Sequence, residues 1–142
     1  MVKKALLVGI NYIGKGDMYI EGCIDDVVSV KQMLMNKMGY EERNIVVLRD
    51  DVDDSQSQPT GKNIMDHLIS TIHQSNNIDE FWFHYSGHGS QIEDTNGDEL
   101  DNKDEIIFPI DYATGGIIHD DIFKQVAQYL KCKTMMVFDC CH

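Results

Sequence analysis

The amino-acid sequence predicts one α/β domain built on a mostly parallel sheet with helices on both of its faces. Three observations predict this fold: short buried strands alternate with amphipathic helices, no segment repeats another, and 142 residues can enclose a hydrophobic core. Strands that alternate with helices are joined by right-handed crossovers, and these crossovers make neighbouring strands parallel. Residues 1–142 are therefore interpreted as a single domain.

Apolar runs and helical periodicity give each element its place. Short runs rich in aliphatic or aromatic residues predict strands over residues 3–10, 44–48, 80–85 and 134–138. Apolar residues at helical spacing predict helices over residues 25–37, 60–73 and 120–130, each begun by an Asp or Thr suited to capping. A hairpin is predicted between the third strand and the last helix, over residues 106–118. In such a sheet, ligands bind beyond the C-terminal ends of the strands.

The charge of the chain is strongly negative, with 24 acidic residues against 12 basic ones and a formal net charge of −12. A surface of this kind repels phosphate backbones, so we expect no nucleic-acid partner. It suits metal ions and basic peptides, although solubility alone also explains the total. The acids gather in two stretches, over residues 50–54 and 93–105.

The cysteines and the hydrophobic segments indicate a cytoplasmic setting. Four cysteines show neither disulfide-scaffold nor Cys-x-x-Cys spacing, which favours a reducing compartment. No apolar run has the length of a membrane span, and the N-terminal region has no secretion-signal pattern. We therefore expect no membrane partner.

Two motifs carry the chemistry, and both follow predicted strands. His88 lies between Gly87 and Gly89, where it fills little space but leaves an imidazole accessible beside a backbone N–H. Cys140 and Cys141 follow the last strand. An imidazole activates a nearby thiol, and the N–H groups of Gly89 and of the cysteine could stabilise an oxyanion. If the two strands are neighbours, the sequence predicts a Cys/His site.

Several segments together resemble the catalytic domain of metacaspases, in order and over the whole chain. They are Ala5–Tyr12, Gly22–Asp26, His84–Ser90, Asp98–Asp101, Asp104–Asp111, Ile118–Asp121 and Asp139–His142. A histidine about fifty residues before the cysteine is also the spacing of caspases. The resemblance implies a caspase-like (caspase-haemoglobinase) three-layer sandwich whose sheet is incomplete on its C-terminal side, the chain being the large-subunit part of the catalytic domain.

The resemblance also implies the catalytic residues. His88 would be the base, Cys141 the nucleophile and Gly89 an oxyanion donor, in a cysteine endopeptidase that forms a thioester. The family pattern has Asp-Ser-Cys-His where this chain has Asp-Cys-Cys-His, so Cys140 occupies the serine position. Cys140 is interpreted as a small packed residue.

Substrate and metal residues follow from the same resemblance. Metacaspases cut after Lys or Arg, which implies a pocket for a basic side chain made by four residues: Cys23, Asp26, Ser86 and Asp139. Taken alone, Asp26 would instead be a helix cap. Many members need calcium, and the matching positions are Asp104, Asp120 and Asp121, whose carboxylates are hard oxygen ligands. Helix capping is the alternative for Asp120 and Asp121. No organic cofactor is expected.

Other metal sites fit less well. An EF-hand loop starting at Asp94 would place Glu99 where a glycine is required and Asp101 where an apolar residue is required, so it is rejected. Zinc is disfavoured because no Cys and His residues have ligand spacing. His67 and His73 are predicted to be surface residues on a helix, and His84 a packed residue that braces the site.

The chain stops one residue after the proposed nucleophile, whereas further strands follow in metacaspases. We therefore expect an open sheet edge at the last strand, able to pair with a small subunit or a second copy. Two functions stay open: a calcium-stimulated peptidase specific for Lys or Arg, and an inactive metacaspase-like binding or regulatory domain. A flavodoxin- or receiver-like domain would explain Asp25 and Asp26 but leaves the His88 and cysteine motifs unexplained.

Overall fold

The structure is a computed structural model that describes residues 1–93 and 103–141, with the backbone alone described at residues 92, 93, 103, 104 and 141. The helices within this part of the chain are α1 (Cys23–Lys37), α2 (Gly61–Gln74) and α3 (Asp120–Tyr129). The strands are β1 (Lys3–Gly9), β2 (Ile45–Arg49), β3 (Glu80–Glu93), β4 (Lys103–Ile107), β5 (Ile118–His119) and β6 (Lys133–Cys141).

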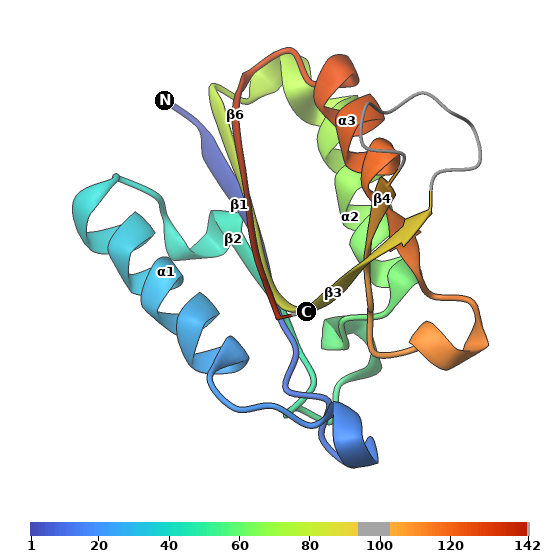
Figure 1. The fold of residues 1–142 in the computed structure, drawn as a ribbon. Helices are drawn as coiled ribbons and strands as arrows, with labels where there is room; N and C mark the ends of the chain where they lie inside the picture. The colour runs from blue at the N-terminus through green and yellow to red at the C-terminus, as the bar shows by residue number, and fades with distance from the viewer. Residues whose placement is uncertain (94–102, 142) are drawn as a thin grey trace.

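The strands form one mixed sheet in the order β2-β1-β3-β4-β5, with β6 also paired to β3 (Figure 1). β1, β2, β6 and the first half of β3 are parallel, whereas β4 pairs antiparallel with the second half of β3 and with β5. Helix α1 lies on one side of the sheet and α2 and α3 on the other. The α/β class is thus confirmed, and the sheet is mixed, with three parallel and two antiparallel pairings among the described strands.

Each face of the sheet has its own hydrophobic core. Leu7 of β1 packs with Val27 and Leu34 of α1, whereas Leu6 packs on the other side with residues of α2 and α3. This alternation explains why β1 is a continuous apolar run, since a strand that is covered on both faces needs apolar residues at every position.

Helix α2 has the predicted cap. Thr60 is its N-cap, and the Oγ1 of Thr60 accepts a hydrogen bond from the Asn63 N–H at 3.0 Å.

The first turns of α1 and α3 differ from the predicted capping. Gly22, with φ of 97°, is the N-cap of α1, and His119 is the N-cap of α3. The expected caps, Asp25 with Asp26 and Asp120 with Asp121, lie instead within the first turns. Their carboxylates still favour the positive end of each helix dipole, but their side chains are available for other partners.

The segment around His88 is a strand and not the loop that its small residues predict. β3 continues to Glu93 because β4 pairs with Gly89–Glu93. Gly87 and Gly89 are small for packing reasons: a Cβ at Gly87 would lie 2.7 Å from the Tyr85 hydroxyl, and one at Gly89 would lie 2.9 Å from the Cys140 Cβ. β6 likewise runs through Cys141, which was expected to follow the strand.

Candidate active site

His88 and Cys141 lie opposite each other on two adjacent parallel strands. The register of β3 and β6 pairs His88 with Cys141, and this is the last pair of that ladder. Neighbouring strands are about 4.8 Å apart, so the fold brings together two residues that are far apart in the sequence. The Cys141 side chain lies outside the described part of the structure. The predicted Cys/His juxtaposition is therefore seen at the level of the backbone.

Two buried tyrosines hold the backbone of His88. The Tyr12 hydroxyl accepts a hydrogen bond from the His88 N–H at 2.8 Å and donates one to the Phe108 carbonyl at 2.6 Å. The Tyr85 hydroxyl donates to the His88 carbonyl at 2.6 Å. Burial raises the pKa of both tyrosines, so each hydroxyl keeps the proton that it donates. The backbone of His88 is thus bound on both sides.

The turn that carries Tyr12 is bound by an aspartate in the turn that follows β2. Tyr12 has a φ of 58°, in the left-handed region that non-glycine residues rarely adopt. The two carboxylate oxygens of Asp50 accept hydrogen bonds from the N–H groups of Asn11 and Ile13, both at 2.8 Å. One member of the acidic cluster at residues 50–54 therefore has a structural role beside the site. The ring of Tyr12 lies 4.6 Å from the imidazole of His88, centroid to centroid.

A backbone carbonyl sets the tautomer of His88. Its Nε2 lies 2.7 Å from the carbonyl oxygen of Met18, in the short helical turn Gly16–Met18. A carbonyl can only accept, so Nε2 carries the proton and Nδ1 is the nitrogen that can receive one. Sequence reasoning missed this contact because Met18 acts through its backbone, which leaves no side-chain signal. It missed the role of Tyr12 for another reason: Tyr12 and His88, which the hydrogen bond joins, are 76 positions apart in the sequence.

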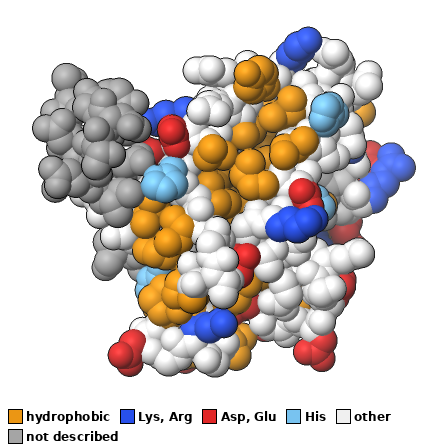
Figure 2. Space-filling view, turned by 90° about the vertical axis from the view of Figure 1, so that its right-hand side faces the viewer, with side chains coloured by type: hydrophobic (Ala, Val, Ile, Leu, Met, Phe, Trp, Pro, Cys, Tyr) orange, Lys and Arg blue, Asp and Glu red, His pale blue; other side chains and the backbone are white. Residues whose placement is uncertain are grey.

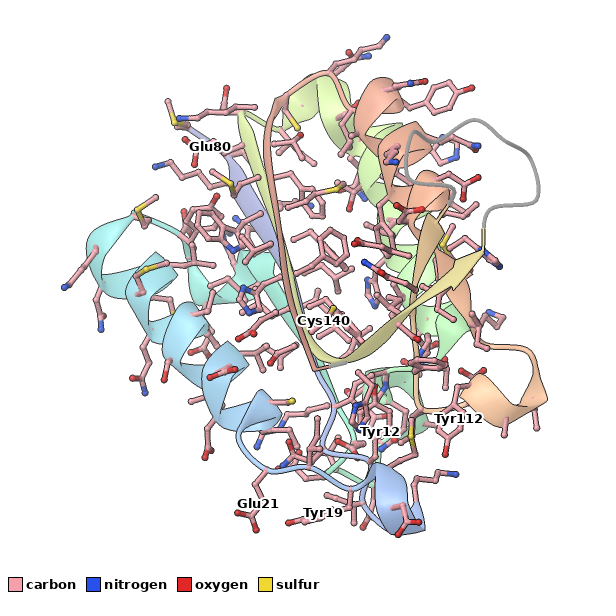
Figure 3. The ribbon with its side chains drawn as sticks, viewed as in Figure 1. Tyr12, Tyr19, Glu21, Glu80, Tyr112 and Cys140 are labelled. Carbon is pink, nitrogen blue, oxygen red and sulfur yellow. The ribbon has the colours of Figure 1, made fainter. Side chains whose placement is uncertain are left out.

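The predicted oxyanion donor, Gly89, lies directly after His88 at the junction of the parallel and antiparallel parts of β3. It pairs with Ile107 of β4, and its Cα approaches Cys140 so closely that a Cβ would lie 3.0 Å from the Cys140 Sγ. Cys140 lies on the side of the sheet that faces α3 (Figure 3).

The residues of the predicted basic-residue pocket gather on the α1 side of the sheet. The Ser86 hydroxyl donates to the Asp26 carboxylate at 3.0 Å, and the register of β3 and β6 pairs Ser86 with Asp139. Cys23 lies near Ser86 as well. Gly9 is the β1 partner of Ser86, and it approaches α1 so closely that a Cβ on Gly9 would lie 2.9 Å from the Cys23 carbonyl. Asp26 and Asp139 are exposed, whereas Ser86 is buried. The arrangement is a buried hydroxyl flanked by exposed carboxylates.

The predicted calcium ligands are only partly described. Asp120 and Asp121 lie in the first turn of α3, and the Oδ2 of Asp120 is 3.5 Å from the Lys124 ammonium. The side chain of Asp104 and all of residues 94–102, including the Asp98–Asp101 motif, lie outside the described residues. Among the residues that are described, no cluster of three or more candidate ligands could hold a metal ion. The carboxylates of Asp120 and Asp121 match the oxygen donors that calcium prefers.

Comparison with known proteins gives one consistent result. The chain is 41% identical to Metacaspase-1 of Pyricularia oryzae and 37% identical to Metacaspase-1 of Schizosaccharomyces pombe, in each case over 99% of this chain. It covers 36% and 33% of those two proteins, so it spans about a third of their length. Protein GSU0716 of Geobacter sulfurreducens shares the fold, with a TM-score of 0.68 at 22% identity over 100% of this chain and 51% of that protein.

Two further findings complete the comparison. No helix in the described part of the chain is long and apolar enough to cross a membrane. The family model for the metacaspase, peptidase C14 domain matches residues 3–142. With the His88 and Cys141 register and near-complete coverage by metacaspases, the chain belongs to the metacaspase family of C14 peptidase domains.

Proposed function

We propose that the protein is a cysteine endopeptidase that hydrolyses peptide bonds after Lys or Arg. The observation that carries the proposal is the register that sets His88 opposite Cys141 in a C14 peptidase domain. With Nε2 held by the Met18 carbonyl, Nδ1 of His88 is the nitrogen that takes the thiol proton. The tyrosine contacts to the His88 backbone support this role because they fix the position of the base before substrate binds.

The reaction has two steps, acylation of the cysteine and hydrolysis of the thioester. The Cys141 thiolate attacks the carbonyl carbon, the N–H groups of Gly89 and Cys141 stabilise the oxyanion, and the C–N bond breaks as His88 gives its proton to the leaving amine. A thioester remains on Cys141. Water then loses a proton to His88 and attacks the thioester, which releases the carboxylic acid and returns the proton to the thiol.

The preference for a basic residue is assigned to Asp26, Ser86, Asp139 and Cys23. The exposed carboxylates of Asp26 and Asp139 supply negative charge, and the buried hydroxyl of Ser86 holds Asp26 in place at 3.0 Å. A lysine ammonium or an arginine guanidinium would form charge-assisted hydrogen bonds there. A substrate aspartate would meet only like charge, so peptides with Asp before the scissile bond should not be cleaved.

Calcium is proposed to stimulate the enzyme through Asp104, Asp120 and Asp121. When bound, it would supply positive charge that offsets the negative charge of these three carboxylates. The ion pair of Asp120 with Lys124 would compete with the metal, so a Lys124→Met variant should bind calcium more tightly than the unmodified chain. Calorimetric titration with calcium tests this, and an unchanged affinity in that variant would count against Asp120 as a ligand.

The free side of β6 is proposed to receive a further strand. Among the described strands, β6 pairs only with β3, and Met135 and Phe138 are 48% and 42% exposed. Phe138 also lines a pocket of about 510 Å³ between β6, β4 and α3. Figure 2 shows hydrophobic side chains gathered on the side of the molecule where α2 and α3 lie. The occupant proposed for the β6 edge is a small subunit, and a dimer in solution would contradict that choice.

The proposal is tested with paired fluorogenic peptides that differ only in Arg or Asp before the scissile bond, with and without calcium. Both the 142-residue chain and the longest natural form should be assayed. Arg cleavage that needs calcium and is lost in Cys141→Ala is the expected result. Cleavage by the longer form alone would show that residues beyond this chain are needed. If neither form cleaves either peptide while calcium is bound, the result would favour a metacaspase-like binding domain without turnover.

A further inference from the structure

A buried histidine lies beside the acidic residues of the proposed cation pocket. His84 is 7% exposed, and within the described part of the chain neither of its ring nitrogens has a partner. A neutral imidazole carries one donor and one acceptor, and burying both without a partner is unfavourable. Such a group in a native protein calls for an explanation, and the proposed mechanism does not use it.

His84 lies on the same face of β3 as the pocket proposed for the substrate cation. His84 and Ser86 are two residues apart on β3, so their side chains lie on the same face of the sheet. Ser86 bonds to Asp26 of α1, which identifies that face as the α1 side. His84 therefore lies one step further into the sheet than Ser86, under the exposed carboxylates of Asp26 and Asp139.

The charges that act on His84 come from two elements. Asp139 of β6 and Asp26 of α1 both favour the protonated ring, but burial outweighs them and lowers the pKa of His84 below its ordinary value. The register neighbours on either side, Leu7 and Val137, carry no charge. The other titratable side chains in the first turn of α1 are Cys23 and Asp25.

We propose that His84 forms the inner wall of the pocket made by Asp26, Ser86 and Asp139, and that a proton on His84 and a substrate cation exclude each other. The inference rests on the function proposed above and adds a specificity residue to it. A neutral His84 leaves both carboxylates available to a lysine or arginine side chain. A protonated His84 engages the same carboxylates and repels the incoming cation, so affinity falls as the pH drops.

Thermodynamic linkage makes the effect reciprocal. If a proton on His84 weakens cation binding by some factor, a bound cation weakens proton binding by the same factor and lowers the pKa of His84 further. The pH dependence should therefore appear in substrate affinity and KM. The chemical step, which depends on His88, should keep its own pH profile.

The experiment measures peptide binding from about pH 5.5 to 8, the range in which histidines titrate. Two peptides are compared, one with arginine before the scissile bond and one with citrulline, its uncharged counterpart. The protein is the full natural chain carrying Cys141→Ala, so that no hydrolysis occurs, and binding is followed by fluorescence anisotropy. His84→Gln is the test variant, and His73→Gln is its matched control because His73 is an exposed residue of α2.

In the protein with His84, arginine-peptide affinity should fall about fivefold or more toward the acidic end, a typical coupling between sites. The fall should be much smaller in His84→Gln, unchanged in His73→Gln, and absent for the citrulline peptide. An equal fall in His84→Gln, with arginine still preferred over citrulline, would overturn the inference and leave the proposed specificity standing. Equal binding of both peptides at every pH would overturn both the inference about His84 and the proposed specificity for a basic residue.

A second measurement covers the case in which His84→Gln does not fold. The His84 ring protons are followed by NMR as the pH changes, with and without the arginine peptide. A lower midpoint in the presence of the peptide is expected. An unchanged midpoint, at peptide concentrations that saturate the site, would also overturn the inference.

Discussion

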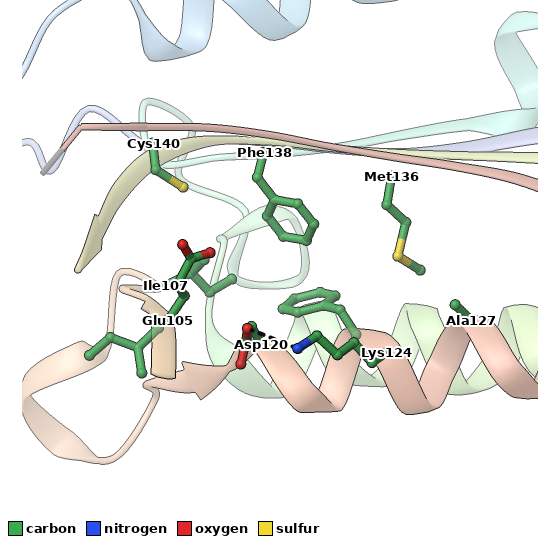
Figure 4. Close-up of a pocket in the computed structure, with 10 residues that line it drawn as sticks. Glu105, Ile107, Asp120, Lys124, Ala127, Met136, Phe138 and Cys140 are labelled. Atoms are coloured by element: carbon green, nitrogen blue, oxygen red, sulfur yellow. Dashed lines mark ion pairs between the residues drawn. The ribbon is translucent and has the colours of Figure 1, made fainter. Parts of the chain in front are cut away.

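The two faces of β3 and β6 carry different chemistry, although they are built from adjacent residues. On the α1 side lie His84, Ser86 and Asp139, close to the carboxylate of Asp26. On the opposite side, Phe138 and Cys140 line a pocket against α3, which also holds the ion pair of Asp120 with Lys124 (Figure 4). Because successive side chains of a strand point to opposite faces, a change of one position moves a residue from one environment to the other.

This alternation explains how one strand end can serve both binding and packing. The α1 face keeps exposed carboxylates over a buried hydroxyl, an arrangement suited to a cation. On the α3 face β6 packs through apolar side chains, with the ring centroids of Phe123 and Phe138 5.0 Å apart. Binding and packing functions are therefore separable by mutation, and the predictions below test that separation.

The largest expected contrast is between the two adjacent cysteines. Cys141→Ala should lower turnover of an arginine reporter about a thousandfold or more, because it removes the proposed nucleophile. Cys140→Ala should leave turnover nearly unchanged and cost about 1 kcal/mol of unfolding free energy, since the side chain of Cys140 is half-buried and borders a pocket. Turnover assays and urea unfolding measure the two effects. Loss of turnover in Cys140→Ala alone would reverse the assignment of the nucleophile.

The next contrast is between two adjacent aspartates of α1. Asp26→Asn should raise KM for an arginine peptide about tenfold to a hundredfold, because a charge paired with the substrate cation is lost. Asp25→Asn is the matched control: the hydrogen bond from Asp51 chiefly, with a smaller effect of Asp25, raises the pKa of the Arg49 guanidinium, and no described contact joins Asp25 to Ser86. Steady-state kinetics separate KM from kcat. Equal effects of the two changes would argue against a defined pocket at Asp26.

A third contrast compares a buried tyrosine with an exposed one. Tyr12→Phe removes the acceptor for the His88 N–H and the donor to the Phe108 carbonyl, so it should cost about 1–3 kcal/mol of unfolding free energy and lower kcat more than it raises KM. Tyr19→Phe, whose hydroxyl makes an exposed contact to Glu21 at 3.3 Å, should change stability by less than about 0.5 kcal/mol. Comparable losses in both variants would contradict the positioning role.

The sequence was sufficient to predict features that depend on local pattern. The apolar run of β1 and the spacing of Ile64 and Leu68 in α2 are visible in a short window. The meeting of His88 with Cys141 was predictable because both follow runs that had to be buried strands, and parallel strands end at one edge. That Ser86 and Asp26 belong to one pocket was predicted only from the resemblance to the family.

Features set by long-range contacts could not be predicted in the same way. Gly87 and Gly89 looked like loop residues, but they are small because Tyr85 and Cys140 occupy the space of their Cβ atoms. The long course of β3 depends on β4, and its small, polar residues carry no signal for that pairing. The left-handed turn at Tyr12 likewise depends on Asp50, in the turn that follows β2. Cys140, which faces Gly89, and Asp50, which binds the turn at Tyr12, lie outside any window that a local pattern covers.

The smallest expected effect concerns stability as a function of pH. Burial lowers the pKa of His84 below its ordinary value of 6.5, so the unfolded chain binds a proton that the folded chain does not bind in the interval between the two. The free energy of unfolding should therefore be highest above about pH 6.5 and fall as the pH drops through that interval. In His84→Gln this part of the decline should disappear, whereas His73→Gln should keep it. Urea unfolding in steps of pH measures the slope, and an identical slope in both variants would show that His84 takes up its proton equally well in the folded and unfolded chain.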